Sequence, residues 1–390
     1  MSELSYLEKL LDGVEVEWKS LGDVVNFQRG RRLVKSQLET RGKYAVYQNS
    51  MTPLGYYHEY NVAAQSSFII CAGAAGEIGY SENEFWAADD VHFAITPEYI
   101  NDRFLFHFLL TQKNKISGQV RRASIPRLSK SVIEKLEFPI PCPDNPEKSL
   151  AIQSEIVRIL DKFTALTAEL TAELTMRKKQ YNYYRDQLLS FDEGEVEWKA
   201  LEEVSTFANG KGHEKDISED GKYIVVNSKF ISTNGEVAKL SNKQLCPLFK
   251  DDILLVMSDL PNGKALSKTF IVDEDHKYTL NQRIGGITVK NSNELLPKFL
   301  HYFLNRTPQL LKHDNGVDQT NLRKGQILEV KIPIISLIKQ VQIVETLDKF
   351  DTYTKSISEG LPREIELRHK QYEYYRDLLF SFPRPETASN

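Results

Sequence analysis

The sequence predicts an α+β fold in which a mixed α/β domain followed by a long helix occurs twice. A tyrosine-rich stretch, KQYNYYRDQLLSF at residues 179–191, returns as KQYEYYRDLLFSF at residues 370–382. The strand-like EVEWK of residues 15–19 returns at residues 195–199. Between these markers each half holds short β-type runs and one aromatic helix, which is the mixture expected of a duplicated α+β chain.

Shorter matches support the duplication and place its borders. The matching pairs are Gly42–Tyr44 with Gly221–Tyr223, Arg103–Phe108 with Lys298–Phe303, Phe138–Ile140 with Ile332–Ile334, and Ile156–Phe163 with Ile343–Phe350. The matches are strong in the helices and weak inside the domains, so two similar scaffolds carry two different surfaces. We place the domains at residues 1–145 and 194–335, and the helical regions at residues 146–193 and 336–390.

The long helices are predicted from their start signals and their apolar periodicity. Asn145 is a candidate N-cap, and Pro146 suits the first helical position. Apolar residues recur every three or four positions, which predicts that the two helices pair along a coiled-coil seam, with an ordinary two-helix hairpin as the plainer interpretation. The seam residues are Ile156, Ile159, Phe163, Leu166, Leu170, Leu174, Tyr181, Tyr184 and Leu188 in the first helix, and Ile343, Leu347, Phe350, Ile357, Leu361, Ile365, Tyr372, Tyr375 and Leu379 in the second.

Two features distinguish the helices from each other. The second helix is four residues longer over the matching stretch, around residues 358–362, where Gly360 and Pro362 predict a break or a kink. The first helix repeats Thr-Ala-Glu-Leu at residues 167–170 and 171–174. One such unit adds roughly 6 Å of helix. The repeat is therefore interpreted as an adjustable spacer, or alternatively as a good helix-forming sequence that happens to repeat.

Inside the domains, β-type runs at Ser67–Cys71, Ile253–Met257 and Gly286–Val289 lie between turn-rich segments. The aromatic helices are expected at Asp102–Gln112 and Pro297–Thr307. Apolar residues surround both helices, so we assign them to the domain cores and not to a functional site.

Composition limits the classes of protein that the chain resembles. The 390 residues suffice for two domains, and the net charge of −4 with a pI of about 6.1 argues against a uniformly basic nucleic-acid binder while leaving room for a local one. Cys71, Cys142 and Cys246 lack CxxC spacing, which fits a reducing compartment. The N-terminal stretch does not read as a signal peptide, and no apolar run is long enough to span a bilayer, so we expect a cytoplasmic protein without membrane contact.

Motifs for catalysis and cofactor binding are missing from the sequence. It lacks a phosphate-binding loop, a dinucleotide fingerprint, an amino-methyltransferase motif and a histidine-rich metal spacing. Glu17-Trp18-Lys19 and its repeat at 197–199 imitate part of a nuclease site, but no partner aspartate is evident, and a scaffold strand with a packed tryptophan is the favoured interpretation. We therefore expect no catalytic residue, no metal site and no bound cofactor in this chain.

Basic, amide and hydroxyl side chains gather instead in loops at matching points of the two halves. Arginines neutralise phosphates or read guanine edges in a bidentate way, and amides suit base edges. For any single loop, solvated surface is the plainer interpretation. The candidate DNA-binding residues are Gln28, Arg29, Arg31, Arg32, Asn49, Ser50, Arg121, Arg122, Ser124 and Arg127 in the first half, and Asn227, Ser228, Lys229, Asn281, Gln282, Arg283, Thr320, Asn321, Arg323 and Lys324 in the second.

Taken together, these stretches resemble the specificity subunits of type I restriction–modification enzymes. The repeated EVEWK entrances, the Leu-Asp-Lys-Phe helix starts at 160–163 and 347–350, the Thr-Ala-Glu-Leu repeat and the Tyr-Tyr-Arg-Asp helix ends carry the resemblance. Within the second domain it extends over Asp252–Arg283. It covers nearly the whole chain.

The resemblance implies two target recognition domains, each reading one half of a bipartite double-stranded DNA target. Two helices paired as an antiparallel coiled coil would hold the domains in inverted orientation, set the gap of unread bases and dock two methyltransferase subunits. Two motor-nuclease subunits would join them, and S-adenosylmethionine, ATP and magnesium are then expected on the partner subunits. The candidate partner-binding residues are Tyr181, Tyr184, Arg185, Tyr372, Tyr375 and Arg376, with packing between helices as the alternative.

Two other functions are compatible with parts of this pattern. One is a self-contained DNA methyltransferase or endonuclease, which the missing motifs oppose. The other is a coiled-coil scaffold without a role on DNA.

Overall fold

The chain forms two compact units, and each unit includes part of both halves of the sequence. The first unit combines residues 1–170 with residues 365–390, and the second consists of residues 171–364. The computed structural model describes residues 6–192, 194–261, 263–355 and 359–384.

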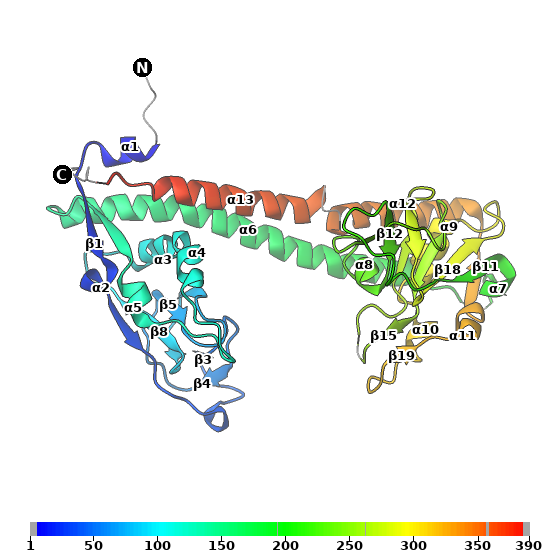
Figure 1. Cartoon of the computed structure of the whole chain (residues 1–390), viewed down its shortest axis with the longest axis horizontal. Coiled ribbons are helices and arrows are strands. Elements are labelled where there is room, and N and C mark those ends of the chain that lie inside the picture. The colour runs from blue at the N-terminus through cyan, green and yellow to red at the C-terminus, as the bar shows by residue number, and fades with distance from the viewer. Residues whose placement is uncertain (1–5, 193, 262, 356–358, 385–390) are drawn as a thin grey trace, which may run out of the picture. The chain divides into compact units, whose positions relative to one another are not determined.

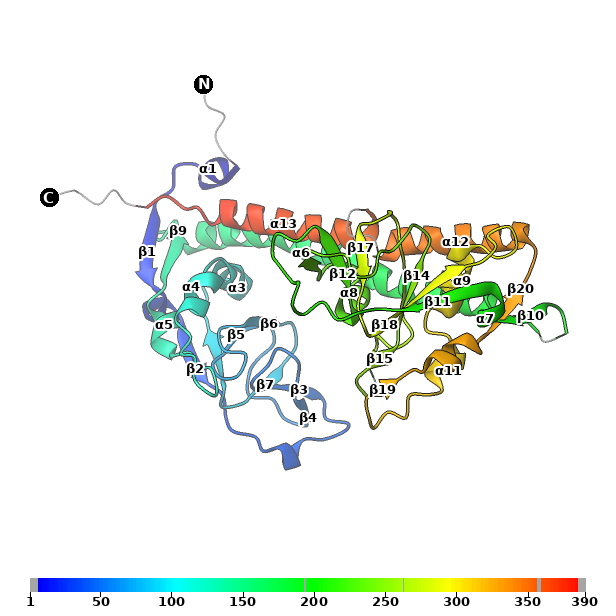
Figure 2. The ribbon, with the colours of Figure 1, turned by 45° about the vertical axis from the view of Figure 1, so that its right-hand side comes forward.

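Two antiparallel strand systems and one mixed sheet form the domain of the first unit (Figures 1 and 2). A four-stranded antiparallel sheet has the order β2-β8-β5-β6, and a three-stranded sheet has the order β4-β3-β7 with β3 and β7 parallel. A separate ribbon pairs β1 with β9. The strands are β1 (Val16–Ser20), β2 (Asn26–Arg29), β3 (Tyr44–Tyr47), β4 (Gly55–Tyr57), β5 (Ser66–Ile70), β6 (Ile78–Ser81), β7 (Phe85–Ala87), β8 (Val91–Ile95) and β9 (Glu137–Pro141), and the helices are α1 (Tyr6–Leu11), α2 (Leu21–Val24), the 3₁₀ turn η1 (Lys35–Gln37), α3 (Asp102–Thr111), α4 (Lys113–Gly118) and α5 (Lys130–Glu134).

The domain of the second unit repeats these three strand systems and adds a two-stranded sheet that pairs β15 with β19. Its sheets have the orders β11-β18-β14-β16 and β13-β12-β17, again with one parallel pair, and its ribbon pairs β10 with β20. The duplication therefore extends through the domain interiors, where the sequence match is weak. The strands are β10 (Glu197–Ala200), β11 (Ser205–Asn209), β12 (Tyr223–Val226), β13 (Lys239–Ser241), β14 (Ile253–Val256), β15 (Ser258–Asp259), β16 (Thr269–Ile271), β17 (Tyr278–Leu280), β18 (Ile284–Val289), β19 (Thr320–Asn321) and β20 (Lys331–Ile334), and the helices are α7 (Leu201–Val204), α8 (Ser228–Ser232), α9 (Pro297–Leu304), α10 (Pro308–Leu311) and α11 (Lys324–Leu328).

The three predicted β-runs and the first aromatic helix are confirmed by β5, β14, β18 and α3, whereas the second aromatic helix is shorter than predicted. α9 ends at Leu304. Arg306 has a φ of 62°, outside the helical range, and Pro308 holds the residue before it in an extended conformation. The chain then starts the separate helix α10.

The long helices begin and break where the sequence predicts. α6 (Pro146–Leu188) is a single helix of 43 residues, and Asn145 Oδ1 accepts a hydrogen bond from Lys148 N (3.0 Å) as an N-cap does. The second helical region is interrupted between α12 (Leu337–Lys355) and α13 (Gly360–Leu379), and Gly360 adopts a φ of 78°. Ser358, part of the stretch predicted to contain the break, lies outside the described residues.

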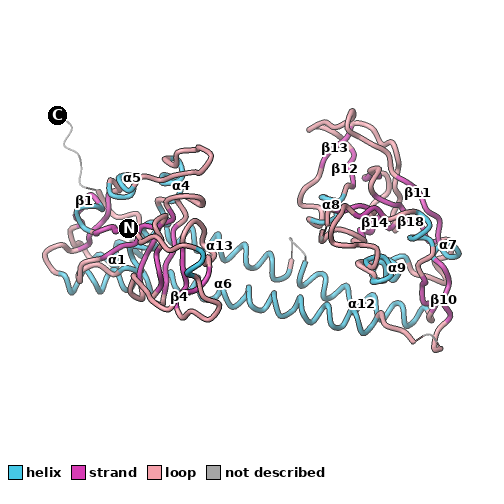
Figure 3. The backbone as a smooth tube through the Cα atoms, turned by 90° about the horizontal axis from the view of Figure 1, so that it is seen from below, coloured by secondary structure: helices cyan, strands magenta, loops and turns pink. Residues whose placement is uncertain are grey.

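Within each unit, α6 runs antiparallel to its helical neighbour (Figure 3). In the second unit Tyr184 stacks on Phe350 of α12 at a ring distance of 5.8 Å, and Tyr353, further along α12, donates a hydrogen bond to Glu173, further back on α6. In the first unit Phe163 stacks on Tyr375 of α13 at 5.3 Å. In both units, therefore, the phenylalanine of one Leu-Asp-Lys-Phe motif meets a tyrosine of the Tyr-Tyr-Arg-Asp motif from the other half of the sequence.

The predicted seam is correct at several positions and wrong at Leu166. Ile156, Tyr181, Ile343, Leu347, Leu361 and Leu379 are buried. Leu166 is 38% exposed, whereas Leu160, which is absent from the predicted seam, is fully buried. Leu160 packs in the core of the first unit, because α6 covers a domain core as well as a neighbouring helix. The predicted seam residue Ile357 lies outside the described residues.

The two EVEWK repeats are strands of the ribbons β1–β9 and β10–β20, as predicted. In the first unit the Trp18 indole donates a hydrogen bond to the Pro383 carbonyl (2.9 Å), and the Arg384 guanidinium lies 4.4 Å from the Trp18 ring. Phe380 and Phe382 are buried, and the Phe104 ring lies 4.9 Å from that of Phe380. The last described residues of the chain thus complete the core of its first domain.

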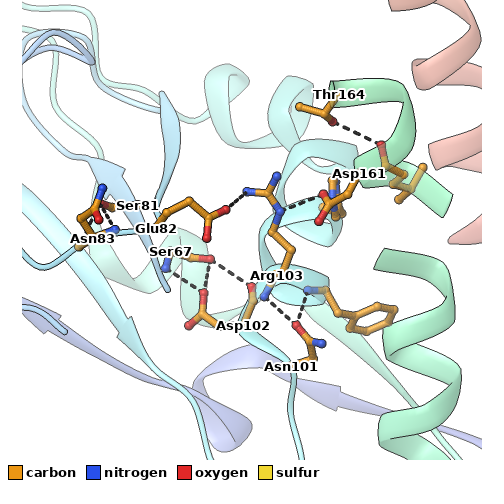
Figure 4. A network of polar contacts seen from close by, with 12 residues as sticks. Ser67, Ser81, Glu82, Asn83, Asn101, Asp102, Arg103, Asp161 and Thr164 are labelled. Carbon is orange, nitrogen blue, oxygen red and sulfur yellow. Dashed lines mark hydrogen bonds and ion pairs between the residues drawn. The ribbon is translucent and has the colours of Figure 1, made fainter. Parts of the chain in front are cut away.

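A polar network fastens α3 to the sheet on one side and to α6 on the other (Figure 4). Asp102 accepts hydrogen bonds from the backbone N–H (2.7 Å) and the hydroxyl of Ser67 on β5. Arg103 Nε donates to Asp161 Oδ1 on α6 (2.9 Å), and the Asn101 N–H donates to Gln153 Oε1 (2.8 Å). Because the contacts come from both faces of α3, the domain and the helix are held in one arrangement.

The second unit repeats this attachment with the same types of acceptor on the long helix and different residues on the domain side. Leu296 N donates to Gln340 Oε1 (2.8 Å), and Gln340, like Gln153, is fully buried. Lys298 Nζ and the Tyr302 hydroxyl both reach Asp348 at 2.6 Å. The repeated Leu-Asp-Lys-Phe motif therefore supplies an acceptor that anchors each domain to its helix.

Asp102 is expected to make the stability of the first unit depend on pH. Burial raises the pKa of its carboxyl to about 6, above the usual value, so the protonated form is favoured in the folded state. Its contribution is therefore fully present below about pH 4 and is lost as the pH rises from about 4 to about 6. Chemical denaturation of wild type and Asp102→Asn across this range should show the variant gaining relative stability as the pH rises. Parallel pH profiles would contradict the assignment.

Candidate nucleic-acid interface

In the first domain, a turn at residues 71–74 is the point where the predicted loops meet. The Ala74 N–H donates to the Asn49 carbonyl (2.9 Å), and the Gly73 N–H donates to the Pro126 carbonyl (3.1 Å). The Leu128 N–H donates to the carbonyl of Cys71 (2.8 Å). The structure therefore brings Asn49 and the loop around Arg127 together on one side of the sheet.

The arginine-rich loop joins the same cluster because Gly30 lets two backbones approach closely. The Gly30 N–H donates to the Val91 carbonyl and the Arg31 N–H to the Ala87 carbonyl, both at 2.9 Å. A Cβ atom at Gly30 would overlap the carbonyl oxygens of Ala87 and Ala88. We call the resulting surface the first loop cluster. It comprises residues 28–32, 49–50, 71–74, 87–91 and 121–128.

Two further predicted residues of this cluster have defined local roles. The loop from Arg121 to Arg127 is closed by two hydrogen bonds between the backbones of its ends (2.9 and 3.1 Å), which leaves Ser124 exposed at its tip. The Ser50 hydroxyl accepts from the Thr52 N–H (3.1 Å) and donates to the Thr52 carbonyl (2.8 Å). Ser50 therefore shapes its turn, and this use competes with the predicted contact to DNA.

The second domain builds an equivalent cluster from different residues. The Leu322 N–H donates to the Met257 carbonyl (2.8 Å), and the Met257 N–H donates to the Arg283 carbonyl (3.1 Å). The Lys211 N–H donates to the Leu280 carbonyl (3.1 Å). This second loop cluster comprises residues 208–212, 226–229, 257–260, 280–284 and 319–324.

The matching hydrogen bonds identify counterparts that the weak sequence match hides. The counterparts are Arg31 and Lys211, Asp89 and Gln282, Asp90 and Arg283, Arg127 and Asn321, and Gln48 and Asn227. Sequence analysis missed Asp89, Asp90 and Lys211. Lys211 could have been predicted from the sequence, because the spacing that aligns the two EVEWK repeats also aligns Gly30 with Gly210.

Some predicted residues of the second cluster form hydrogen bonds within the domain. Asn227 caps α8 by accepting a hydrogen bond from the Phe230 N–H (2.9 Å), which places Ser228 and exposed Lys229 in its first turn. Thr320 is 8% exposed, and its hydroxyl donates to Asp314 (3.2 Å). The Thr320 side chain is therefore used within the domain.

The remaining predicted residues of the second cluster are accessible. Gln282, Arg283, Asn321, Arg323 and Lys324 are exposed, and Asn281 is partly exposed. The backbone N–H of Arg323 donates a hydrogen bond to Gln326 Oε1 (2.8 Å) at the start of α11. This bond does not involve the guanidinium group of Arg323. The cluster thus offers both amide and basic side chains.

The arginines of the loop clusters differ from those of the helices in their ion pairing. Helical arginines have acidic partners, such as Arg158 with Glu155 and Arg185 with Asp186, both at 2.6 Å. Arg29 donates a hydrogen bond only to a backbone carbonyl, that of Asp89 (2.6 Å). Exposed guanidinium groups without a carboxylate partner suit phosphate oxygens and base edges. Within the described part of the chain, no ion pair is formed by Arg29, Arg31, Arg32, Arg121, Arg122, Arg127, Arg283 or Arg323.

The first tyrosine of each helix end makes contacts within its own unit. Tyr181 is 5% exposed, and burial together with Asp351 holds the pKa of its hydroxyl above the usual range. The Tyr372 hydroxyl donates to His107 Nδ1 (2.8 Å), and the other nitrogen of this buried ring donates to Asp161 (2.9 Å). Both tyrosines pack between helix and domain, the alternative considered for them.

Other residues of the helix ends face outward. Tyr184 and Tyr375 remain 46% and 40% exposed despite their stacking. Tyr183 and Tyr374, which were not predicted, are 59% and 65% exposed. A signal for them exists, since each lies two positions after an inward-facing tyrosine, Tyr181 or Tyr372, and so lies on another face of the helix. Arg185 and the second predicted arginine, Arg376, pair with the adjacent aspartates.

The stretches that imitate catalytic motifs have structural partners. Glu17 and Lys19 form an ion pair with each other at 2.9 Å on strand β1. Burial raises the pKa of the Cys71 thiol to about 12, and all three cysteines are free. Across the described ranges, no group of three or more histidine, cysteine or acidic side chains is placed to hold a metal ion. Nor does any helix there combine the length and apolar character needed to cross a bilayer.

Comparison with known proteins agrees with the duplicated fold. The family model described as the type I restriction modification DNA specificity domain matches twice, at residues 13–176 and 193–367. The chain is 41% identical to the specificity subunit of the Escherichia coli type I restriction enzyme EcoR124I/EcoR124II, over the full length of both. It is 32% identical to the EcoprrI specificity subunit of the same species, over 92% of this chain and 93% of that one.

Solved structures show the same fold at lower identity. The S subunit of a type I restriction–modification system from M. genitalium superimposes with a TM-score of 0.59 and 18% identity, covering 96% of this chain and 98% of that one. These relatives are named as specificity subunits, and none of the names describes a self-contained enzyme or a scaffold.

Proposed function

Because the chain belongs to the family of type I restriction–modification DNA specificity subunits, we propose that its two loop clusters each read one half of a bipartite DNA target. One observation carries this proposal. The two clusters occupy equivalent places on a duplicated scaffold, yet they present different side chains, as at Asp90 and Arg283. Equivalent placement suits one kind of ligand, and different side chains suit two different base sequences.

The unpaired arginines supply the attraction to the DNA backbone. The net charge of the whole chain is slightly negative, so binding depends on local positive charge within the clusters. Arg31 and Arg32 directly follow the backbone crossing at Gly30, and both are exposed. We assign them to phosphate contacts, and the recess described below to base contacts.

Replacing Arg31 and Arg32 by glutamine is expected to weaken DNA binding about equally for all sequences. Each lost phosphate contact should lower the slope of log K against log salt by about 0.9. Fluorescence anisotropy of the complex with its methyltransferase partner, measured over a series of salt concentrations, provides both quantities.

Arg158→Gln is the matched control, because Arg158 is paired with Glu155 on the outside of α6 and should leave the slope unchanged. An unchanged slope in the Arg31/Arg32 double variant would remove these residues from the interface. The absence of DNA binding by the wild-type complex would remove the proposed function itself.

The exposed helix ends are proposed to dock the partner subunits. Tyr183 and Tyr374 lie at equivalent positions of the two repeats, so each can receive the same partner. Two copies of a methyltransferase subunit fit this pair of sites, and two motor-nuclease subunits would join for restriction. The chemistry would then belong to the partners, which would carry S-adenosylmethionine, ATP and magnesium, while this chain would supply position and specificity.

A further inference from the structure

A recess in the first loop cluster is lined by side chains of both charges. It has a volume of about 170 Å³ and lies where β2, β8 and the loops after β5 and β7 meet. Arg29 and Arg127 contribute positive charge, and Asp89 and Asp90 contribute negative charge. The recess is lined by Arg29, Cys71, Ala72, Asp89, Asp90, His92, Arg127 and Leu128.

The charged groups of the recess do not neutralise one another. Arg29 Nε donates to the backbone carbonyl of Asp89 (2.6 Å) and not to a carboxylate. In the portion of the chain that the structure describes, neither aspartate and neither arginine forms an ion pair. Donors and acceptors are therefore both available to a ligand that enters the recess.

The backbone and the floor of the recess are held in place. The Cys71 N–H donates to the Asp90 carbonyl (2.7 Å), and the Leu128 N–H that follows Arg127 donates to the Cys71 carbonyl (2.8 Å). Cys71 Sγ lies 2.6 Å from His92 Nδ1, and burial lowers the pKa of this histidine, so the floor is uncharged near neutral pH. The charged side chains above the floor therefore project from a backbone that is already held in place before DNA binds.

The carboxylates of Asp89 and Asp90 indicate which chemical group of DNA would enter the recess. A carboxylate repels phosphate, so a pair of unpaired aspartates beside DNA is favourable only where it meets hydrogen-bond donors. In the major groove the amino group of cytosine is such a donor, and guanine beside it offers two acceptors that suit a guanidinium group. A G·C pair therefore combines a donor for the carboxylates with acceptors for the guanidinium groups of this recess.

We propose that the recess of the first domain reads a G·C base pair in one half of the target. A guanidinium group of Arg29 or Arg127 donates to guanine, and a carboxylate of Asp89 or Asp90 accepts from cytosine. The inference rests on the proposed function, because it requires DNA at the first loop cluster. The second cluster has Gln282 and Arg283 in place of the aspartates, so the same position there reads a different pattern.

The test compares duplexes that differ at one base pair. The target is first identified by sequencing methylated adenines in the host DNA, and each G·C pair of both half-sites is then replaced by A·T. Affinities are measured for complexes of the methyltransferase partner with wild type, Asp89→Asn, Asp90→Asn and the double variant. Wild type should prefer G·C over A·T at one position of one half-site by about 5- to 150-fold, the range for one good bidentate contact.

In the double variant this preference should fall at that position alone, because the cytosine contact is lost while the arginine contact to guanine remains. Affinity for unrelated DNA should stay the same or rise, because two negative charges are removed. Gln282→Ala is the matched control in the second cluster, and it should change the preference in the other half-site only.

The proposal is overturned if the aspartate variants keep every base preference, or if they lose affinity equally for all duplexes. Failure of the proposed function looks different, because the wild-type complex would then discriminate at no position in either half-site.

Discussion

Phe104→Ala is expected to lower the free energy of unfolding of the first unit by about 3–5 kcal/mol. The Phe104 side chain is fully buried, and its ring lies 5.7 Å from that of Phe138 and 4.9 Å from that of Phe380. Removing it leaves a cavity between β9 and the C-terminal segment, which should detach more readily. Hydrogen exchange measured by mass spectrometry in increasing denaturant would separate the two units, which need not unfold together.

The duplicated scaffold offers a matched control for this variant. Phe299 is the counterpart of Phe104 on α9 and is also fully buried. Phe299→Ala should destabilise the second unit and leave exchange in the first unit unchanged. If Phe104→Ala left peptides around residues 104, 138 and 380 as protected as in wild type, the C-terminal segment would not be part of that core.

Gly210→Ala is expected to abolish discrimination in one half-site while the rest of the fold persists. A Cβ atom at this position would overlap the backbone of Asn281, so the segment after β11 that carries Lys211 must move away from residues 280–281. Overpacking of this kind costs about 1–3 kcal/mol, and the displaced loop can no longer align with DNA. We expect at least about a tenfold loss of affinity for the specific duplex, which corresponds to about 1.4 kcal/mol.

Gly325→Ala is the control for that experiment. Gly325 lies in α11, close in sequence to Arg323 and Lys324, and an added Cβ atom there meets nothing within 4 Å. It should bind DNA like wild type. Wild-type affinity and base preferences in Gly210→Ala would show that the crossing at Gly210 does not position the second loop cluster.

The parts of the fold that could be predicted are those with local signals. Asn145 and Pro146 mark the start of α6, and Gly360 and Pro362 mark the break between α12 and α13, because capping and backbone restrictions act within a few residues. The repeated motifs revealed the duplication because they can be recognised directly in the sequence. The predicted loops also meet in two clusters at equivalent places.

The errors arise where burial depends on distant contacts. Thr320 looks like a surface residue in sequence, and Tyr181 fitted both the helix seam and an exposed partner contact. Other elements bring Asp314 and Asp351 to these side chains. Asp89 and Asp90 were missed because β7 has only three residues, too few for an alternating pattern to mark its end. Only the backbone hydrogen bonds show that these aspartates stand where the second domain has Gln282 and Arg283.

The attachment of the C-terminal segment to the first domain has a consequence for biosynthesis. Residues 6–141 leave the ribosome early, yet the core around Phe104 stays uncovered until Phe380 and Phe382 have been translated. The second unit is a continuous stretch, residues 171–364, and holds all its core residues sooner. The domain that is made first is therefore the last to be finished, and a nascent chain that stops before residue 380 exposes an apolar surface to chaperones and proteases.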